Sequence, residues 1–347
     1  MGNLWCQEAY CAVDDKPILL DPGESLGEVE ILRLVTVQRT AAVYEAQRAR
    51  QPLLLKVAHD GMQERLKREA AFLLELRRRK VHHPALPILL PAYDQADLVS
   101  YPYGKAVLRG QTFYYTALDN VPGETLRDFL QRNPQPWYRH AAWLILAVSD
   151  AVALMHSAQR LHLCLSPECI LVRNDMQGIP RPLLVDLGTV TRPEDFERNW
   201  ERSFVPPAYL APELLSETGS RFGAFTDVYG LGLMFYEMLA GRPAYDARLS
   251  SDTEVYQEIL DRTPPTLERA DLRNLPQIVE KAISRDYRIR PQHIIALAKE
   301  IQANLPSVPR EKQPRRVNWR TVAVVLSAAM AITLLLVLAL SLTASLG

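Results

Sequence analysis

The segment from residue 162 to residue 172, HLCLSPECILV, brings together side chains that are able to do chemistry. His162 could exchange protons, and the thiols of Cys164 and Cys169 could form a redox pair or bind a metal. Small apolar cysteines also fill packed positions, and we favour this interpretation for both of them. We likewise expect His162 to be a packed core residue rather than a base. The four cysteines of the chain do not form the two close C-x-x-C pairs of a zinc site, and a reducing compartment fits them best.

The charge balance bears on possible partners. Forty basic residues balance forty acidic residues, so no overall field favours nucleic acid, and we expect no nucleic-acid partner. The chain has 347 residues, of which 48% are hydrophobic, which suits one domain of about 250 to 300 residues with extensions.

Short apolar runs in the first part of the chain predict antiparallel strands. Residues 29–58 contain VEILRLV and PLLLKVA, and residues 111–121 read QTFYYTALDNV. Between them, residues 63–79 carry apolar side chains at helical spacing with charges on the opposite face. These apolar residues are Leu66, Ala70, Leu73 and Leu74. The pattern predicts a small lobe made of a sheet and one helix.

The second part of the chain is predominantly helical in pattern from residue 137 onward. We therefore predict an α+β fold with a small sheet-rich lobe and a larger helical lobe. The expected organisation is an N-terminal extension (1–28), a two-lobed domain (29–303), a proline-rich basic linker (304–320) and a transmembrane helix (321–346).

Several motifs occur in the order found in the Ser/Thr protein kinase family, which the chain resembles from about residue 29 to residue 303. HLCLSPECILV corresponds to the catalytic loop H-R-D-L-x-x-x-N, LLVDLGTV to the D-F-G segment and YLAPELL to the A-P-E segment. The resemblance implies the two-lobed kinase fold. It also implies that Glu213 of the A-P-E segment pairs with Arg290, and that Asp227 belongs to the same structural framework.

The resemblance implies a nucleotide site that is partly retained. Lys56 occupies the position that grips the phosphates, Glu69 the position that pairs with this lysine, and Asp186 the position that holds magnesium. The implied cofactor is ATP with magnesium or manganese, weakly bound. The hinge, where backbone groups would meet the adenine, is expected near Asp119, Asn120 and Val121.

The catalytic loop has lost its functional residues. Cys164 replaces the aspartate that accepts the substrate proton, and Cys169 replaces the asparagine that holds a second magnesium ion. Ser166 replaces the lysine, and Leu163 replaces the arginine that would contact a phosphorylated activation loop. A general base contributes roughly 100- to 10,000-fold to the rate, and a thiol does not replace it unless its pKa is strongly lowered. No intact catalytic residue is therefore expected in this loop.

The loop that covers the phosphates in kinases, G-x-G-x-x-G-x-V, corresponds to TVQRTAAV here. Its three glycines become Thr36, Gln38 and Ala41. Glycine is needed there because the backbone must come close to the phosphates in conformations that are costly for other residues. We expect this loop to grip phosphates poorly.

The C-terminal region predicts a membrane anchor. No charged residue occurs from Thr321 to Gly347, and about 25 helical residues span roughly 38 Å, enough to cross a bilayer core of about 30 Å. Basic residues precede this span, so the kinase-like domain is expected in the cytoplasm, the C-terminus outside and the linker near anionic lipid. These basic residues are Arg310, Lys312, Arg315, Arg316 and Arg320.

Three functional hypotheses follow. The leading one is a membrane-anchored pseudokinase that signals by binding a cytoplasmic protein partner or by sensing a nucleotide. The second is an active Ser/Thr kinase with a non-standard catalytic loop, which the retained Lys56, Glu69 and Asp186 favour. The third is a structural adaptor that works independently of nucleotide.

Overall fold

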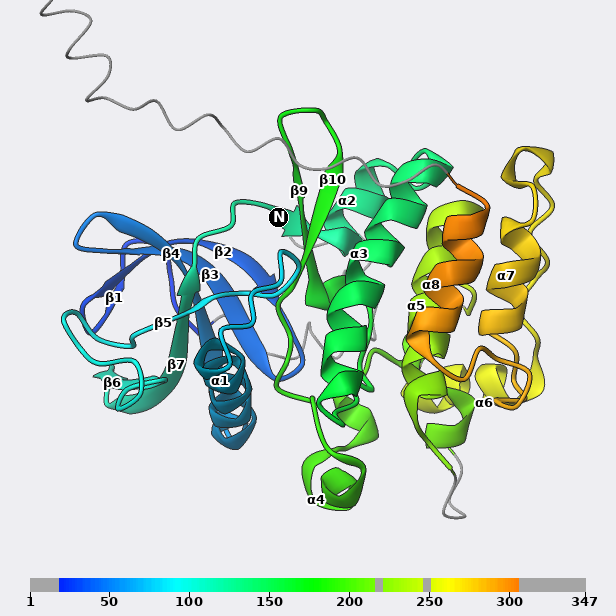
Figure 1. Ribbon diagram of the computed structural model, residues 1–347. Coiled ribbons are helices and arrows are strands. Elements are labelled where there is room, and N and C mark those ends of the chain that lie inside the picture. Colours follow the sequence, from blue (N-terminus) through cyan, green and yellow to red (C-terminus); the bar gives the residue numbers. More distant parts are fainter. Residues whose placement is uncertain (1–18, 216–220, 246–250, 306–347) are drawn as a thin grey trace, which may run out of the picture. The chain divides into compact units, whose positions relative to one another are not determined.

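The computed structural model describes residues 19–215, 221–245 and 251–305, which Figure 1 shows as ribbons. Backbone contacts group residues 1–308 into one compact unit and residues 309–347 into another, and every element described below belongs to the first. The linker from residue 306 onward and the predicted span 321–346 lie outside the described residues, as do residues 1–18.

The smaller lobe is a sheet with one helix. Its strands form an antiparallel seven-stranded sheet in the order β1-β2-β3-β4-β7-β5, with β6 also paired to β7. The strands are β1 (Ser25–Leu26), β2 (Val29–Val37), β3 (Ala41–Arg48), β4 (Gln51–Ala58), β5 (Leu89–Leu90), β6 (Gly104–Leu108) and β7 (Gln111–Asp119), and the helix is α1 (Gln63–Arg78).

The larger lobe is mostly helical, and a small sheet of β8, β9 and β10 joins it on the side of the smaller lobe. Its elements are β8 (Glu124–Thr125), α2 (Leu126–Arg132), α3 (Tyr138–Ser157), β9 (Ile170–Asn174), β10 (Pro180–Leu184), α4 (Phe196–Asn199), α5 (Ala224–Ala240), α6 (Asp252–Asp261), α7 (Leu275–Ala282) and α8 (Ile294–Ala303). The predicted two-lobed arrangement is confirmed.

The alternation of β4 decides which side chains reach the space between the lobes. Leu53, Leu55 and Val57 pack into a core on one face of the sheet. The intervening residues, Leu54 and Lys56, therefore point to the other face, toward the larger lobe. The helix α1 covers this second face, and the apolar residues predicted for it are buried.

Among the described residues, α3 is the helix whose length and apolar composition would allow it to cross a membrane. Most of it is buried in the larger lobe, where it packs against α5, α8 and β10. Such burial is typical of the core helix of a globular domain.

Candidate nucleotide site and catalytic loop

Three residues of the predicted nucleotide site meet between the lobes. Lys56 Nζ of β4 donates to Glu69 Oε2 of α1 at 2.6 Å and to Asp186 Oδ1, just after β10, at 2.9 Å. It also donates to the backbone oxygen of Val185 at 3.1 Å. The side chains of Lys56, Glu69 and Asp186 are only 2%, 0% and 6% exposed, so this ion pair is closed to water.

The charged side chains of this group shift one another's pKa values. Burial on its own would lower the pKa of Lys56, but the carboxylates of Asp186 and Glu69 outweigh burial and raise it above its usual value. Burial would raise the pKa of Asp186, and the nearby Lys56 ammonium more than offsets this, so the pKa is lowered. Burial dominates at Glu69 and raises its pKa. One ammonium thus serves two buried carboxylates.

The turn between β2 and β3, where the phosphate-covering loop was predicted, packs onto the larger lobe. Its tip residues Gln38, Arg39 and Thr40 are 3%, 7% and 3% exposed. Arg39 Nη1 donates to the backbone oxygen of Ser203 at 3.0 Å and lies 3.4 Å from Asp252 Oδ2 at the start of α6. The turn closes tightly through a 2.7 Å hydrogen bond from Gln38 N to Ala41 O. This hairpin tip therefore bridges the lobes through side chains that a glycine loop would lack.

An apolar layer joins the lobes beside Lys56. Leu54 lies on the same side of β4 as Lys56 and is paired directly with Leu118 of β7. Both leucines are buried and belong to one core with Leu171 of β9. Leucine side chains from both lobes thus pack together at the edge of the cleft.

Cys164, at the position of the catalytic base, is buried, and its thiol donates a hydrogen bond instead of accepting one. Its Sγ donates to the backbone oxygen of Phe204 at 3.2 Å, and the residue is 2% exposed. Burial raises the pKa of this thiol well above its usual value, and the negative charge of Asp186 adds to the shift. A protonated thiol does not take up a substrate proton.

The side chains of Cys169 and His162 also form hydrogen bonds with backbone groups. Cys169 Sγ donates to Ser166 O at 2.9 Å and accepts from Ser166 N at 3.3 Å, and burial raises its pKa to about 12. His162 is completely buried, and burial lowers its pKa. These observations favour the packing interpretation of both side chains over a redox pair or a base.

The backbone of the loop is held by Asp227 of α5. Its carboxylate accepts from His162 N at 2.9 Å and from Leu163 N at 2.7 Å, and it also contacts His156 Nε2 at 2.8 Å. Leu163 has a φ of 58°, a conformation that is costly for a branched side chain and that these two hydrogen bonds stabilise. The shape of the loop is retained although its reactive side chains are lost.

The predicted pair between the A-P-E segment and Arg290 is confirmed. Arg290 Nη1 and Nη2 donate to Glu213 Oε1 and Oε2 at 2.8 and 2.9 Å, and both side chains are almost completely buried. The guanidinium also lies 4.3 Å from the ring centroid of Tyr229. This bidentate pair connects the segment before α5 to the loop before α8.

The comparisons agree with this geometry. The family model described as the protein kinase domain matches residues 43–304. This chain belongs to the protein kinase family. It is 28% identical over 255 residues to the serine/threonine-protein kinase pkn2 of Myxococcus xanthus, an alignment that covers 71% of this chain and 28% of pkn2. It is 31% identical over 274 residues to the DNA damage-responsive serine/threonine-protein kinase RqkA of Deinococcus radiodurans, covering 77% of this chain and 37% of RqkA.

A solved structure supports the fold of this kinase domain. The crystal structure of the PknI kinase domain of Mycobacterium tuberculosis superposes with a TM-score of 0.53 at 20% identity, covering 83% of this chain and 99% of the other. The alignments cover 28% of pkn2 and 37% of RqkA, so the chain corresponds to only a part of these relatives.

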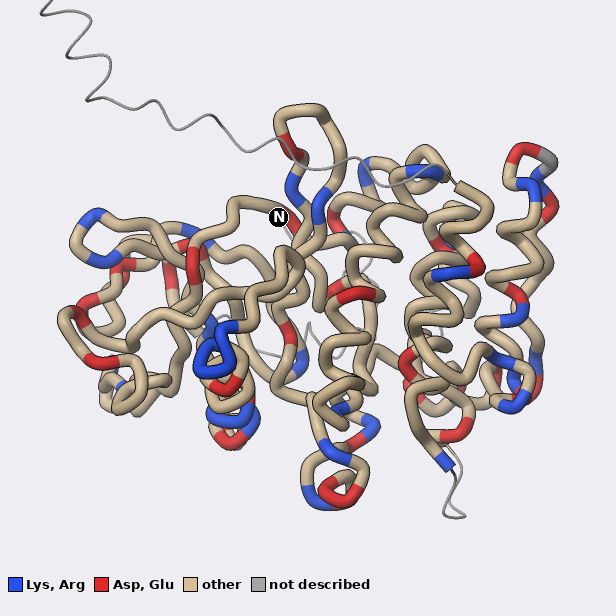
Figure 2. Tube along the Cα trace, viewed as in Figure 1, with Lys and Arg blue, Asp and Glu red and all other residues tan. Residues whose placement is uncertain are grey.

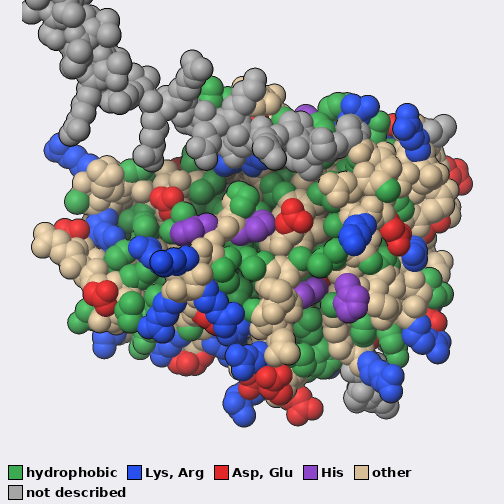
Figure 3. Space-filling view, in the orientation of Figure 1, with side chains coloured by type: hydrophobic (Ala, Val, Ile, Leu, Met, Phe, Trp, Pro, Cys, Tyr) green, Lys and Arg blue, Asp and Glu red, His purple; other side chains and the backbone are tan. Residues whose placement is uncertain are grey.

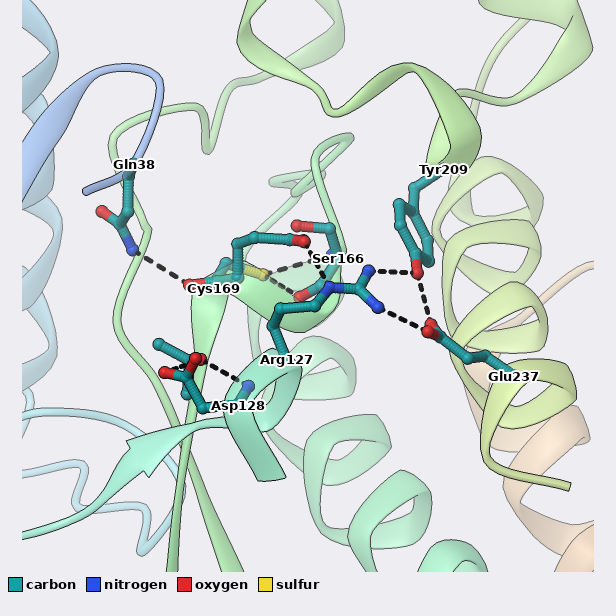
Figure 4. Close-up of polar contacts among 9 residues, drawn as sticks. Gln38, Arg127, Asp128, Ser166, Cys169, Tyr209 and Glu237 are labelled. Atoms are coloured by element: carbon teal, nitrogen blue, oxygen red, sulfur yellow. Dashed lines mark hydrogen bonds and ion pairs between the residues drawn. The ribbon is translucent and has the colours of Figure 1, made fainter. Parts of the chain in front are cut away.

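The kinase domain contains a buried polar cluster that the sequence patterns did not indicate (Figure 4). Arg127 of α2 donates through Nε to Glu168 of the catalytic loop at 2.8 Å, and through its other nitrogens to Glu237 of α5 and to the hydroxyl of Tyr209. Tyr209 also donates to Glu237. Gln38 of the hairpin tip reaches the backbone oxygen of Glu168 at 3.5 Å. The one available signal was Glu237, a lone carboxylate within the apolar run GLGLMFYEMLAG.

The predicted hinge lies where β7 ends, apart from the Lys56 group. Asp119 and Val121 line a pocket of about 260 Å³ together with side chains of α1, β5 and β10, and neither Lys56 nor Asp186 lines it. Residues 77–80, at the end of α1, are all basic (Figure 2). They are exposed on the face of the domain that Figure 3 shows. Asn120 lies between the two hinge residues, and its side-chain oxygen is buried without a hydrogen-bond partner among the described residues.

The side chains at the metal positions do not fit the metal-bound nucleotide of an active kinase. Asp186 is engaged by Lys56, and the thiol of Cys169, a soft ligand with a raised pKa, is engaged by Ser166. Magnesium prefers oxygen ligands in a near-octahedral arrangement. No group of three or more metal-binding side chains occurs among the described residues.

Proposed function

We propose that this kinase domain acts as a pseudokinase, anchored to a membrane, that signals by binding a protein partner rather than by transferring phosphate. The observation that carries the proposal is Cys164, a buried thiol with a raised pKa at the position of the catalytic base. Its sulfur donates to a carbonyl oxygen, so its geometry and its protonation state both oppose proton abstraction. A positioned base supplies roughly 100- to 10,000-fold of the rate of transfer.

The closed cleft supports the same proposal. A nucleotide with its metal would have to compete with the direct contact between Lys56 and Asp186 at 2.9 Å. It would also have to displace the hairpin tip, whose Arg39 is anchored to the larger lobe. Both changes cost interactions that the domain makes in this structure, so nucleotide affinity is expected to be weak.

The retained Lys56, Glu69 and Asp186 favour a second candidate, an active Ser/Thr kinase. Phosphoryl transfer depends largely on positioning and charge stabilisation, and these three residues are positioned together. The Ser/Thr kinases among the relatives are consistent with such an activity. A nucleotide-independent adaptor is the third candidate, and the closed cleft favours it.

The membrane part of the proposal rests on sequence. Residues 321–346 lack charge and the preceding linker is basic, and both features support a topology with the kinase domain on the cytoplasmic side and the C-terminus outside. This topology presents the domain to cytoplasmic protein partners.

A thermal-shift titration of the full chain in lipid nanodiscs with ATP, with and without magnesium or manganese, separates these functions. A ligand that binds only the folded state raises the unfolding temperature, and above its dissociation constant the rise grows with the logarithm of its concentration. Stabilisation that follows this concentration dependence and that Asp186→Asn reduces would identify a nucleotide sensor. Absence of any shift at millimolar ATP would identify the adaptor. In a separate transfer assay, metal-dependent transfer of phosphate from ATP to protein that Asp186→Asn abolishes would overturn the pseudokinase proposal.

A further inference from the structure

The short connection between α2 and α3 exposes a tryptophan. Trp137 is 50% exposed, although large aromatic side chains are usually mostly buried. Its ring is fixed by edge contacts with Tyr138, His140 and Trp143, at centroid distances of 6.1, 5.1 and 6.0 Å. The guanidinium of Arg139 lies 5.0 Å from its centroid. The indole is thus held rigidly at the surface, flanked by a cation.

A second apolar side chain is exposed at the turn between β9 and β10. Met176 is 80% exposed. The turn is held in place by Asp175, which pairs with Arg181 at 2.8 Å and accepts from Gln177 N at 2.8 Å and from Ile179 N at 3.0 Å. Because Asp175 fixes the turn, Met176 is held out in solvent.

These two features lie at the same end of the larger lobe. The strand β10 packs against α3, and Figure 1 shows the β9–β10 turn and the start of α3 at the upper end of the lobe. Asp175 is also close enough to His140 to oppose the burial that lowers the pKa of this histidine.

The described chain ends at this same end of the lobe. The helix α8 packs against α3 and runs antiparallel to it, so the C-terminal end of α8 lies beside the start of α3 (Figure 1). The predicted span begins at Thr321, and the 15 intervening residues, 306–320, reach at most about 50 Å when fully extended. The end of the lobe that carries Trp137 is therefore the end from which the chain continues toward the predicted span.

The charge of the two segments is positive. Residues 132–140 and 173–181 contain one carboxylate, Asp175, which is neutralised by Arg181. They also contain Arg132, Arg139 and Arg173, of which Arg132 pairs with Glu124 of β8. Tryptophan, tyrosine and arginine, with an apolar body and a polar tip, are the residues that bind at the boundary between lipid and water.

We propose that residues 132–140 and 173–181 form a membrane-facing surface that rests on anionic lipid, with Trp137 and Met176 inserted at the headgroup level. This inference rests on the membrane anchoring proposed above and adds an orientation to it. The surface holds the domain against the bilayer, so the opposite end of the lobe and the hairpin tip face the cytoplasm. Basic side chains near an anionic leaflet strengthen such binding.

The test uses tryptophan fluorescence of the full chain in nanodiscs whose phosphatidylcholine and phosphatidylglycerol carry bromine on their acyl chains, which quenches nearby indoles. The wild type is compared with Trp137→Phe, which removes the reporter but keeps an aromatic ring at an exposed position. Trp319→Phe reports on the anchor, because Trp319 lies directly before the predicted span. Trp200→Phe is the matched control, since Trp200 is buried at 9% exposure.

The inference predicts that brominated lipid quenches less of the emission in Trp137→Phe than in the wild type, and that phosphatidylcholine alone weakens this difference. Quenching that depends on Trp319 but not on Trp137 would overturn the membrane-facing surface and leave the anchor intact. Absence of lipid quenching from both would overturn the anchor and this inference together. Slower amide hydrogen exchange in residues 132–140 only after a protein partner is added would assign the surface to that partner instead.

A second readout does not depend on any substitution. Amide hydrogen exchange of the wild-type chain is expected to slow in residues 132–140 and 173–181 when phosphatidylglycerol is added to phosphatidylcholine nanodiscs. The exposed basic residues 77–80 at the end of α1 serve as an internal control for non-specific attraction. Equal slowing at residues 77–80 would contradict a specific surface.

Discussion

Replacing Lys56 by methionine is expected to destabilise the domain, because the lysine is enclosed here. The change keeps most of the length of the side chain and removes the ammonium between Glu69 and Asp186, whose side chains are 0% and 6% exposed. Removing one partner of a buried ion pair costs about 3–5 kcal/mol, because the remaining charge stays buried without compensation. A lysine in an open, hydrated cleft would cost at most about 1 kcal/mol.

The assay is urea unfolding of residues 1–308, which form one compact unit, followed by tryptophan fluorescence. Lys67→Met is the matched control, since Lys67 makes a 2.7 Å ion pair with Glu64, which is 67% exposed. We expect Lys56→Met to lower the free energy of unfolding by about 3–5 kcal/mol and the control to change it by at most about 1 kcal/mol.

The effect of Lys56→Met should also depend on pH. Lys56 lowers the pKa of Asp186, so the wild type gains stability above the unfolded-state pKa and loses it as the pH falls through the folded-state pKa. Without the ammonium, burial raises the pKa of Asp186 and raises that of Glu69 further, so protonation of these two groups favours the folded variant as the pH falls. The difference between the two proteins should therefore be largest near pH 7 and should shrink below about pH 5. A loss below 1 kcal/mol at neutral pH, or a loss that grows in acid, would refute the closed ion pair.

Three further predictions concern the framework, the base position and the hairpin tip. Glu213→Ala should lower the free energy of unfolding by about 3–5 kcal/mol because it leaves buried Arg290 uncompensated, whereas Glu300→Ala, whose partner Lys281 is 45% exposed, should change it little; urea midpoints that shift equally would contradict this. Cys164→Asp should not restore phosphate transfer and should destabilise the fold, because it places a carboxylate beside the Phe204 carbonyl oxygen. Cys164→Ser is the matched control in the phosphate-transfer assay and in the unfolding measurement. Arg39→Ala should speed amide exchange of residues 37–41, since the tip loses its contacts with Ser203 and Asp252, whereas Arg33→Ala at an exposed pair with Glu45 should leave this exchange unchanged.

The ion pairs of the framework could be predicted because they belong to ordered motifs. The positions of Lys56, Glu69 and Asp186, and of Glu213 with Arg290, were read from motif order, and the structure brings each set together. The helical spacing of α1 also predicted which of its residues face the core, because the helix period follows from backbone geometry.

The closure of the cleft could not be predicted in this way. The motif TVQRTAAV indicated only a loop without glycines, whereas the contacts of Arg39 reach Ser203 and Asp252, 164 and 213 positions away in sequence. The Arg127 cluster likewise joins residues 41 to 110 positions apart. No spacing rule connects residues that only the packing of the two lobes brings together.

The most direct test of the pseudokinase account is transfer of labelled phosphate from ATP by the full chain in nanodiscs, to itself and to general protein acceptors, with magnesium and with manganese. Asp186→Asn and Cys164→Ser are measured in parallel. The account predicts no incorporation above that of Asp186→Asn under either metal. Incorporation that Asp186→Asn abolishes would show that the domain catalyses transfer despite the buried thiol at position 164, and it would contradict the account.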